Sequence, residues 1–209
     1  MPTPAQAPLA PRKAPAQRRS RVMVEALVEA AARILEDAGP AGFNTNAVAA
    51  RAGVSVGSLY QYFPGKAALV AELSRRGAEA LLAGLKAAVE AGPGGSLEAD
   101  VGRLARAAIA WQCERPALER ALDQMETGLD LPTDALGTTG QIQALILRLI
   151  APHLPGEAEA ALSHAATDSL VLARALIDQA VARGDAASPA FEARLVGALC
   201  GYLSAVAAV

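Results

Sequence analysis

The chain has 209 residues, which is enough for one large domain or two small ones. Hydrophobic residues make up 53% of it and aromatic residues only 3%, so its core must consist of Ala, Leu and Val, which favours packed helices over a sheet. Residues 1–66 carry eight Lys or Arg and four Asp or Glu, a charge of +4, whereas the whole chain has a net charge of -2, which leaves -6 for the remainder. A basic end on an acidic body is typical of a protein that presents one end to a polyanion.

Several classes of protein are disfavoured at once. Cys113 and Cys200 lie far apart, and with His153 and His164 they form no spacing typical of a disulfide framework or a metal site, so we expect no metal and no cofactor. We find no Gly-rich phosphate loop and no nucleophile elbow, so we do not expect an enzyme. No apolar region resembles a secretory signal, and the longest apolar run, 196–209, is too short to cross a bilayer. These features predict a soluble cytoplasmic protein that has no membrane partner.

Residues 1–17 are rich in Pro and Ala and predict a disordered arm. Arg18, Arg19 and Arg21 end this arm and begin the first helix, which the apolar spacing places at about 20–38, before Gly39 and Pro40. The arginines are either a solvated charge run or an arm that follows a DNA backbone or its minor groove, and both interpretations stay open.

The stretch from Phe43 to Lys66 predicts two short helices joined by a tight turn. Asn44 or Thr45 caps the first helix, Gly53 ends it, and Ser55 caps the second, whose buried side is Leu59 and Phe63. A Pro at position 64 suits the first turn of a third helix. This arrangement is a helix-turn-helix, whose second helix can lie in a DNA major groove.

Only helices are predicted after this stretch. A long helix to about residue 91 is followed by Gly92-Pro93-Gly94-Gly95. The caps and apolar stripes then predict helices over about 96–113, 116–127, 141–150, 157–183 and 189–207, with a loop over 128–132.

The segments LVEAAARILEDAG and AGVSVGSLYQYFPGK resemble the N-terminal signature of TetR/AcrR-type transcriptional regulators. One departure is Asn44, where the family usually has Thr, and Asn is an equally good helix N-cap. The resemblance implies an all-α fold of about nine helices, with a helix-turn-helix domain over 18–66 that enters a linking helix over 64–91. It also implies a helical effector-binding and dimerisation domain over 67–209.

The side chains that face away from Leu59 and Phe63 are the expected DNA readers. Gln61 can pair with adenine, Val56 can pack on a thymine methyl, and Gly57 lets the backbone approach. Hydroxyl groups and helix N-termini suit phosphates, and the resemblance implies a phosphate contact at Lys66. The full predicted set is Thr45, Asn46, Ser55, Val56, Gly57, Ser58, Tyr60, Gln61, Tyr62 and Lys66. Tyr60 and Tyr62 could instead lie at the edge of the core.

The last two helices are apolar on more than one face, which indicates either a homodimer or full burial within one chain. The resemblance implies dimers, and a palindromic operator needs two reading heads. We therefore expect Leu172, Leu176, Phe191, Leu195, Leu199 and Leu203 at a dimer interface.

Large or polar residues within the apolar helices are the only indications of an effector site. They are Trp111, Gln112, Gln124, Met125, Gln143, His164, Thr167 and Asp168. Each could equally be a surface residue or part of a filled core. Because the body has few aromatic residues, a pocket there favours an apolar small molecule over a stacked planar one.

The sequence thus predicts a ligand-responsive repressor that binds a palindromic operator as a dimer and is released by a small effector. The alternative is a constitutive or architectural DNA-binding dimer, in which the body only dimerises.

Overall fold

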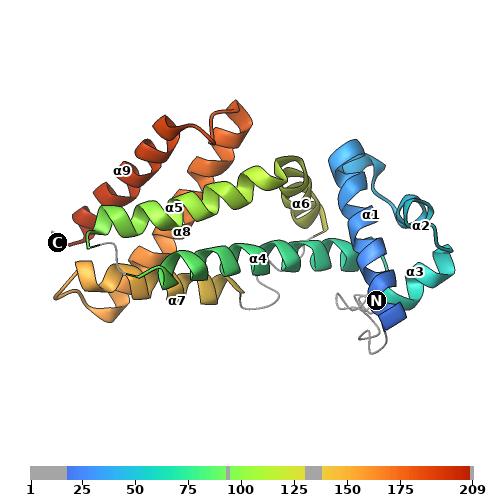
Figure 1. The fold of residues 1–209 in the computed structure, drawn as a ribbon, viewed down its shortest axis with the longest axis horizontal. Coiled ribbons are helices and arrows are strands. Elements are labelled where there is room, and N and C mark those ends of the chain that lie inside the picture. The colour runs from blue at the N-terminus through green and yellow to red at the C-terminus, as the bar shows by residue number, and fades with distance from the viewer. Residues whose placement is uncertain (1–17, 93–94, 130–137, 208–209) are drawn as a thin grey trace, which may run out of the picture. The chain divides into compact units, whose positions relative to one another are not determined.

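The computed structural model of the chain describes residues 18–92, 95–129 and 138–207, which form nine α-helices and one short 3-10 helix (Figure 1). They divide into two compact units. Unit one consists of residues 18–77 and 117–129, and unit two of residues 78–92, 95–116 and 138–207, so α4 (Lys66–Glu90) belongs to both. The predicted all-α fold is confirmed. The arm predicted over residues 1–17 and most of the loop predicted over 128–132 lie outside the described residues.

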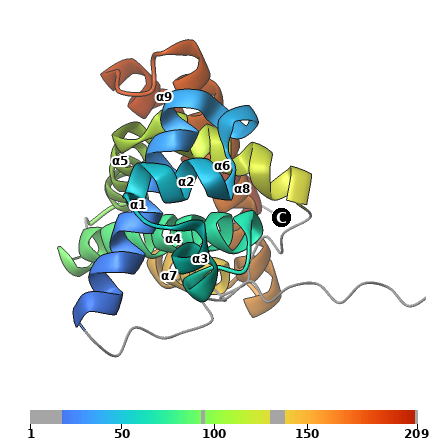
Figure 2. The same ribbon diagram turned by 90° about the vertical axis from the view of Figure 1, so that its right-hand side faces the viewer.

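Unit one is built on α1 (Arg18–Gly42), which packs against α2 (Thr45–Ala52), and α2 packs against α3 (Val56–Tyr62) (Figure 2). The apolar face of α1 is buried between Val24 and Leu35, with Leu27, Ala31 and Leu35 at most 1% exposed. Gly39 adopts φ 62° and interrupts α1 where the sequence predicts its end, although one further turn follows.

Caps define α2 and α3 as the sequence predicts. The N–H of Ala47 donates to Oδ1 of Asn44 at 2.9 Å, so Asn44, and not Thr45, caps α2. Gly53 ends this helix in the left-handed conformation, with φ 70° and ψ 30°. The N–H of Ser58 donates to Oγ of Ser55 at 3.1 Å and caps α3. These local interactions fix the tight turn between the two helices.

A helix distant in sequence completes the core of unit one. α6 (Pro116–Leu129) contributes Leu118, Ala121, Leu122 and Met125 to the same buried cluster as Phe63. The chain leaves unit one in α4 and returns in α6, so the unit is made of two separate stretches.

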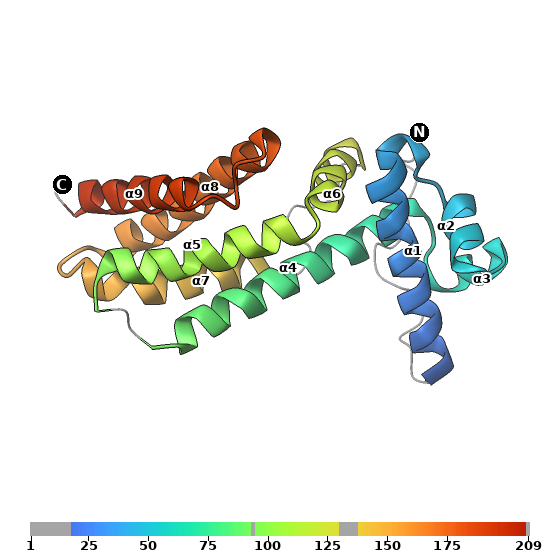
Figure 3. The same ribbon diagram turned by 45° about the horizontal axis from the view of Figure 1, so that its top comes forward.

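Unit two contains α5 (Leu97–Glu114), α7 (Thr138–Ile150), the 3-10 helix η1 (Ala151–His153), α8 (Glu159–Arg183) and α9 (Pro189–Val206). α8 packs against α5, α7 and α9, and α9 also packs against α5 (Figure 3). Ser96 and Ser188 cap α5 and α9, and Gly184 ends α8 with φ 79°, as the sequence predicts. Alanine and leucine fill the space between these helices.

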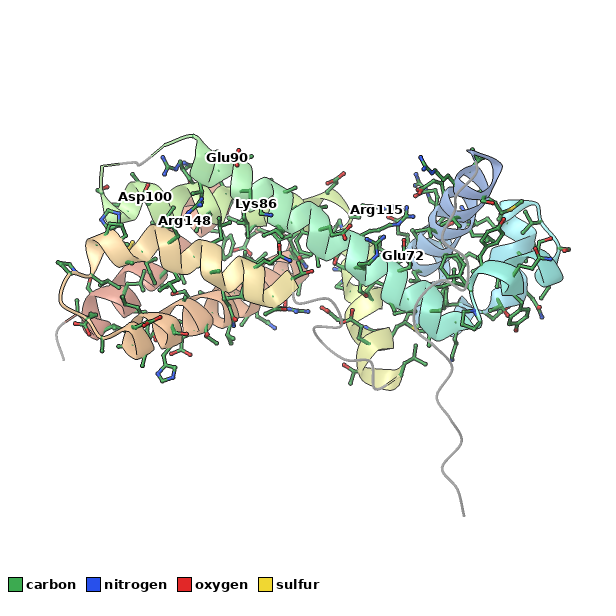
Figure 4. The ribbon with its side chains drawn as sticks, turned by 90° about the horizontal axis from the view of Figure 1, so that it is seen from below. Glu72, Lys86, Glu90, Asp100, Arg115 and Arg148 are labelled. Carbon is green, nitrogen blue, oxygen red and sulfur yellow. The ribbon has the colours of Figure 1, made fainter. Side chains whose placement is uncertain are left out.

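Buried polar side chains join the helices of unit two. The carboxylate of Asp100, which is 4% exposed, pairs with Arg103 on α5 and lies 2.8 Å from Nε2 of His153 in η1 (Figure 4). Nε2 of Gln112 donates to Oδ1 of Asp178 on α8 at 3.2 Å. Since a buried polar group needs a partner, these interactions fix which helices lie together.

The predicted dimer interface requires a correction. The sequence places Phe191, Leu195, Leu199 and Leu203 at the surface of the last helix, whereas the structure buries all four in the protomer's own core, at most 7% exposed. They are covered because α9 packs against both α5 and α8. Only Leu172 and Leu176 of the predicted set lie at the surface, 38% and 37% exposed.

None of the described helices is both long and apolar enough to cross a membrane.

Candidate nucleic-acid interface

The short helix α3 has one buried side and one open side. Leu59 is fully buried, as is Phe63 directly after the helix, and the two attach α3 to the core of unit one. Gly57, Tyr60 and Gln61 are exposed. Because the apolar side is committed to the core, the groups on the open side are free for a binding partner.

A pair of hydroxyl groups joins α3 to the start of α2. The Oη atom of Tyr60 lies 3.3 Å from Oγ1 of Thr45, and Tyr60 is 42% exposed. Thr45 and the exposed Asn46 occupy the first turn of α2, where N–H groups and the positive end of the helix dipole favour an anion. The pair is therefore suited to a phosphate group.

A second hydroxyl pair joins α3 to the start of α1. Oη of Tyr62 donates to Oγ of Ser20 at 3.5 Å, and both residues are half-buried. Tyr62 also packs its ring against the core of unit one, so the core-edge alternative applies to its ring but not to its hydroxyl. Ser20 is absent from the sequence-based set, because only the fold brings it next to Tyr62.

The remaining predicted readers lie on or next to α3. Ser55 and Ser58 are joined by a hydrogen bond between their Oγ atoms, which lie 2.8 Å apart, and Ser55 is exposed. Val56 packs partly against the core, while Lys66 is exposed at the first residue of α4. No Cβ placed on Gly57 would meet a neighbour closer than 3.8 Å, so its lack of a side chain is not required by packing. The predicted readers thus occupy one continuous region of unit one.

Two arginines of unit one are paired with carboxylates. Nη1 of Arg51 donates to Oδ2 of Asp37 at 2.8 Å, and Arg33 pairs with Glu29 at 2.7 Å. Both pairs are exposed, and such pairs are weak in water. The guanidinium of Arg51 is therefore paired with the carboxylate of Asp37 and is not an unpaired cation.

The predicted effector residues do not converge. Met125 is buried in the core of unit one and Gln124 is exposed on the same helix, whereas the other six lie in unit two. Within unit two, Nε2 of Gln143 donates to Oγ1 of Thr167 at 3.3 Å. His164 is exposed. Met125 therefore belongs to the packing of the helix-turn-helix unit.

Two further predicted effector residues have partners of their own in unit two. Asp168 accepts a hydrogen bond from Oη of Tyr202 at 2.5 Å, which raises the pKa of Tyr202 to about 12. Gln112 is buried and bonded to Asp178, next to the half-buried Trp111. Among the residues that the structure describes, no group of three His, Cys, Asp or Glu side chains could hold a metal ion.

Comparison with known proteins identifies both parts of the chain. A family model described as bacterial regulatory proteins of the tetR family matches residues 27–73, and a tetracyclin repressor-like C-terminal domain matches residues 96–203. The fold is similar to that of a TetR-family transcriptional regulator from Streptomyces coelicolor, with a TM-score of 0.64 and 20% identity over 88% of this chain and 99% of that one. A TetR transcriptional regulator from Rhodococcus sp. RHA1 gives a TM-score of 0.60 and 21% identity over 89% and 98%. No curated protein matches the chain in sequence.

Proposed function

We propose that this chain, which belongs to the TetR family of bacterial regulatory proteins, is a ligand-responsive repressor that binds a palindromic operator as a homodimer in the cytoplasm. The family consists of DNA-binding transcriptional regulators and not of enzymes. The observation that carries the proposal is the open side of α3, a helix whose Tyr60 and Tyr62 form hydroxyl pairs with Thr45 and Ser20. A helix in the major groove has one phosphate backbone on each side, and the two pairs suit these two backbones.

Each reader receives a role from its chemistry. Gln61 is exposed and can form two hydrogen bonds with adenine, while Val56 can pack on a thymine methyl. Gly57 lets the backbone approach the base edges. Hydroxyl groups and N–H groups would hold phosphates through Thr45, Asn46, Ser55, Ser58, Tyr60 and Tyr62, with Lys66 as the charged contact.

A second copy of the chain is the partner that the α8–α9 surface suits. Val171, Leu172 and Leu176 expose apolar surface on α8, at 61%, 38% and 37%. The exposed positions of α9 include four small residues, namely Gly197, Ala198, Gly201 and Ala205. Small residues allow helices to approach closely, and an apolar helical face of this kind favours a bundle shared by two chains.

Sedimentation equilibrium tests this interface. We expect the double variant Leu172→Glu, Leu176→Glu to be monomeric, because two carboxylates would be buried without partners. Ser163→Glu, an exposed change on the same helix about half a turn round from Leu172, is the control and should stay dimeric. A double variant that remains dimeric would place the interface elsewhere.

The effector site is proposed for unit two, close to Gln112 and Gln143. Their hydrogen bonds to Asp178 and Thr167 supply polar groups within a core of Leu, Ile, Val and Ala, which suits a small, mostly apolar effector. A thermal-shift panel of apolar and planar compounds tests this, and a clear preference for planar cations would contradict it.

α6 is the element through which an effector would act on the DNA-binding unit. It packs into the core of unit one, yet only Arg115 separates it from α5 of unit two. An effector that prefers one arrangement of α5 over another would therefore bias α6, and only its differential affinity for the two states counts. We propose the domain division predicted from the sequence, 18–66 and 67–209, in addition to this packing of α6 into unit one.

Selection of bound genomic fragments, with and without added metabolites, tests the function as a whole. Gln61→Ala should lower affinity for the selected operator by about 1–3 kcal/mol but change little on other DNA. Lys66→Ala should weaken binding to all sequences and lower the salt slope by about one. If no fragment binds at low salt, the proposed function fails. DNA binding that no metabolite alters would favour a constitutive or architectural dimer.

A further inference from the structure

Arg76 on α4 lies between two carboxylates that belong to different helices of unit one. Its Nη1 and Nη2 atoms donate to Oε2 and Oε1 of Glu25 on α1, at 2.5 and 2.9 Å. Its Nε atom donates to Oε1 of Glu72 on α4 at 2.8 Å. The planar guanidinium fork matches a carboxylate at two points, which an ammonium group cannot do. One side chain thus joins α1 to α4 in a defined geometry.

Glu72 anchors this network inside unit one. It is only 6% exposed, and it also accepts hydrogen bonds from Nε and Nη2 of Arg75 at 2.8 and 2.7 Å (Figure 4). Burial by itself raises the pKa of Glu72, but the hydrogen bonds and charges of Arg75 and Arg76 outweigh it, and the pKa is lowered. The pKa of Arg76 is raised, first by its hydrogen bonds to Glu25. Glu72 and Arg76 are therefore both charged at neutral pH.

The position of Arg76 along α4 gives this network its importance. Between Lys66 and Arg76, the side chains of Ala68, Leu69, Val70 and Leu73 lie in the core of unit one. Gly77 follows Arg76, and α4 leaves unit one directly after it. A helical Gly is weaker than Ala by about 1 kcal/mol, so α4 is held firmly up to Arg76 and is easier to bend at Gly77.

We propose that Arg76 is a positioning residue for DNA binding, which fixes the angle between α1 and α4 by bridging Glu25 and Glu72. The angle matters because Ser20 lies on α1 and Lys66 begins α4, so both would shift relative to α3 if it changed. Arg76 does not itself act on DNA, since its three donor nitrogens are directed at carboxylates. The inference rests on the proposed role of α3 and its neighbours in binding DNA.

The test compares Arg76→Lys and Glu25→Gln with wild-type protein on a genomic fragment that the wild type binds, using fluorescence anisotropy across a salt series. We expect each variant to weaken binding about tenfold, and the double variant to lose little more, because residues of one network are not additive. The salt slope should fall by at most about one, because Lys66 is the charged phosphate contact that a changed angle would displace. Glu29→Gln is the matched control: it breaks a 2.7 Å ion pair within α1 alone and should leave binding unchanged.

Helical content by circular dichroism verifies that each variant is folded at the temperature of the assay. Should Arg76→Lys fail to fold, Glu25→Gln still decides, because the Glu25 side chain is 63% exposed and its loss costs little stability. Folded variants that bind like the wild type overturn the inference. A Glu25→Gln variant that binds more tightly than the wild type also overturns it, because Arg76 released from Glu25 would then be a phosphate contact. Wild-type protein that binds no fragment overturns the DNA-binding role itself, and with it this inference.

Discussion

The surface of α3 in unit one and the core of unit two use their polar side chains in opposite ways. On α3 of unit one, hydroxyl and amide groups stand on the surface, next to a helix whose apolar side is buried by Leu59. In unit two, Asp100 and Gln112 are buried and each bonds to another helix. The polar groups on α3 are thus left open to a partner, while Asp100 and Gln112 are used for internal pairing. A binding surface can be recognised in the first unit from its chemistry, whereas the polar residues of the second mainly specify its packing.

The largest expected effect is on the buried side of α3. Leu59→Ala removes a fully buried side chain and leaves a cavity, so the free energy of unfolding should fall by about 2–5 kcal/mol. Urea denaturation followed by circular dichroism measures this change. Val22→Ala, at a position 63% exposed on α1, is the control and should change stability by at most about 0.5 kcal/mol. Equal effects at the two positions would mean that α3 is not anchored by its apolar side.

Removing a buried partner in unit two should have the next largest effect. Asp100→Ala leaves Arg103 and His153 without their shared acceptor, which should cost about 1–3 kcal/mol of unfolding free energy. Denaturation of Glu98→Ala, an exposed acidic position on the same helix, serves as the comparison and should show a smaller loss. If Asp100→Ala is as stable as the wild type, the polar groups of unit two do not specify its packing.

Acid should weaken the charged network of unit one. The pKa of Glu72 is below its ordinary value of 4.5 in the folded state, so its contribution is present above about pH 4.5 and is lost as the pH falls toward the folded value. Thermal melting between pH 6 and pH 3 should therefore show a decline that is shallower in Glu72→Gln. A decline of the same depth in this variant would assign the acid sensitivity to other groups.

The smallest expected effect concerns the exposed pair of Tyr202 and Asp168. Tyr202→Phe removes one hydrogen bond at the surface of unit two and should cost about 0.5 kcal/mol. Because folding raises the pKa of Tyr202 from 10.0 to about 12, this contribution is complete below pH 10 and is lost as the pH rises through 12. Absorbance at alkaline pH should show a tyrosine ionisation near pH 12, and Tyr202→Phe should remove that step.

The helix-turn-helix could be predicted because its determinants are local. The caps Asn44 and Ser55 and the left-handed Gly53 each act within a few residues. The local sequence therefore determines where α2 ends and where α2 and α3 begin. Pro64 lies outside α4, which begins at Lys66, because proline and Gly65 form the bend before the helix. Local chemistry therefore predicted these elements to within a residue or two.

The remaining features depend on contacts between distant segments. An apolar stripe on α9 looks the same whether it faces a second copy or α5 and α8, and so Leu195 and Leu199 were assigned to the wrong surface. In the same way, nothing local indicates that Met125 packs beside Phe63 or that Ser20 meets Tyr62. Such pairings follow from the fold, and the spacing of residues along one helix does not contain them.

The contribution of α6 to unit one bears on how such regulators can be recombined. A chimera made by exchanging residues 1–77 would take the N-terminal stretch of unit one from another protein. It would keep the native Leu118, Leu122 and Met125, which pack in the original core. A graft that also exchanges residues 117–129 transfers both stretches of the unit together. The portable DNA-reading module of this protein is therefore discontinuous. Three junctions, after residues 77, 116 and 129, are needed to move it intact, and one cut after the helix-turn-helix is not enough.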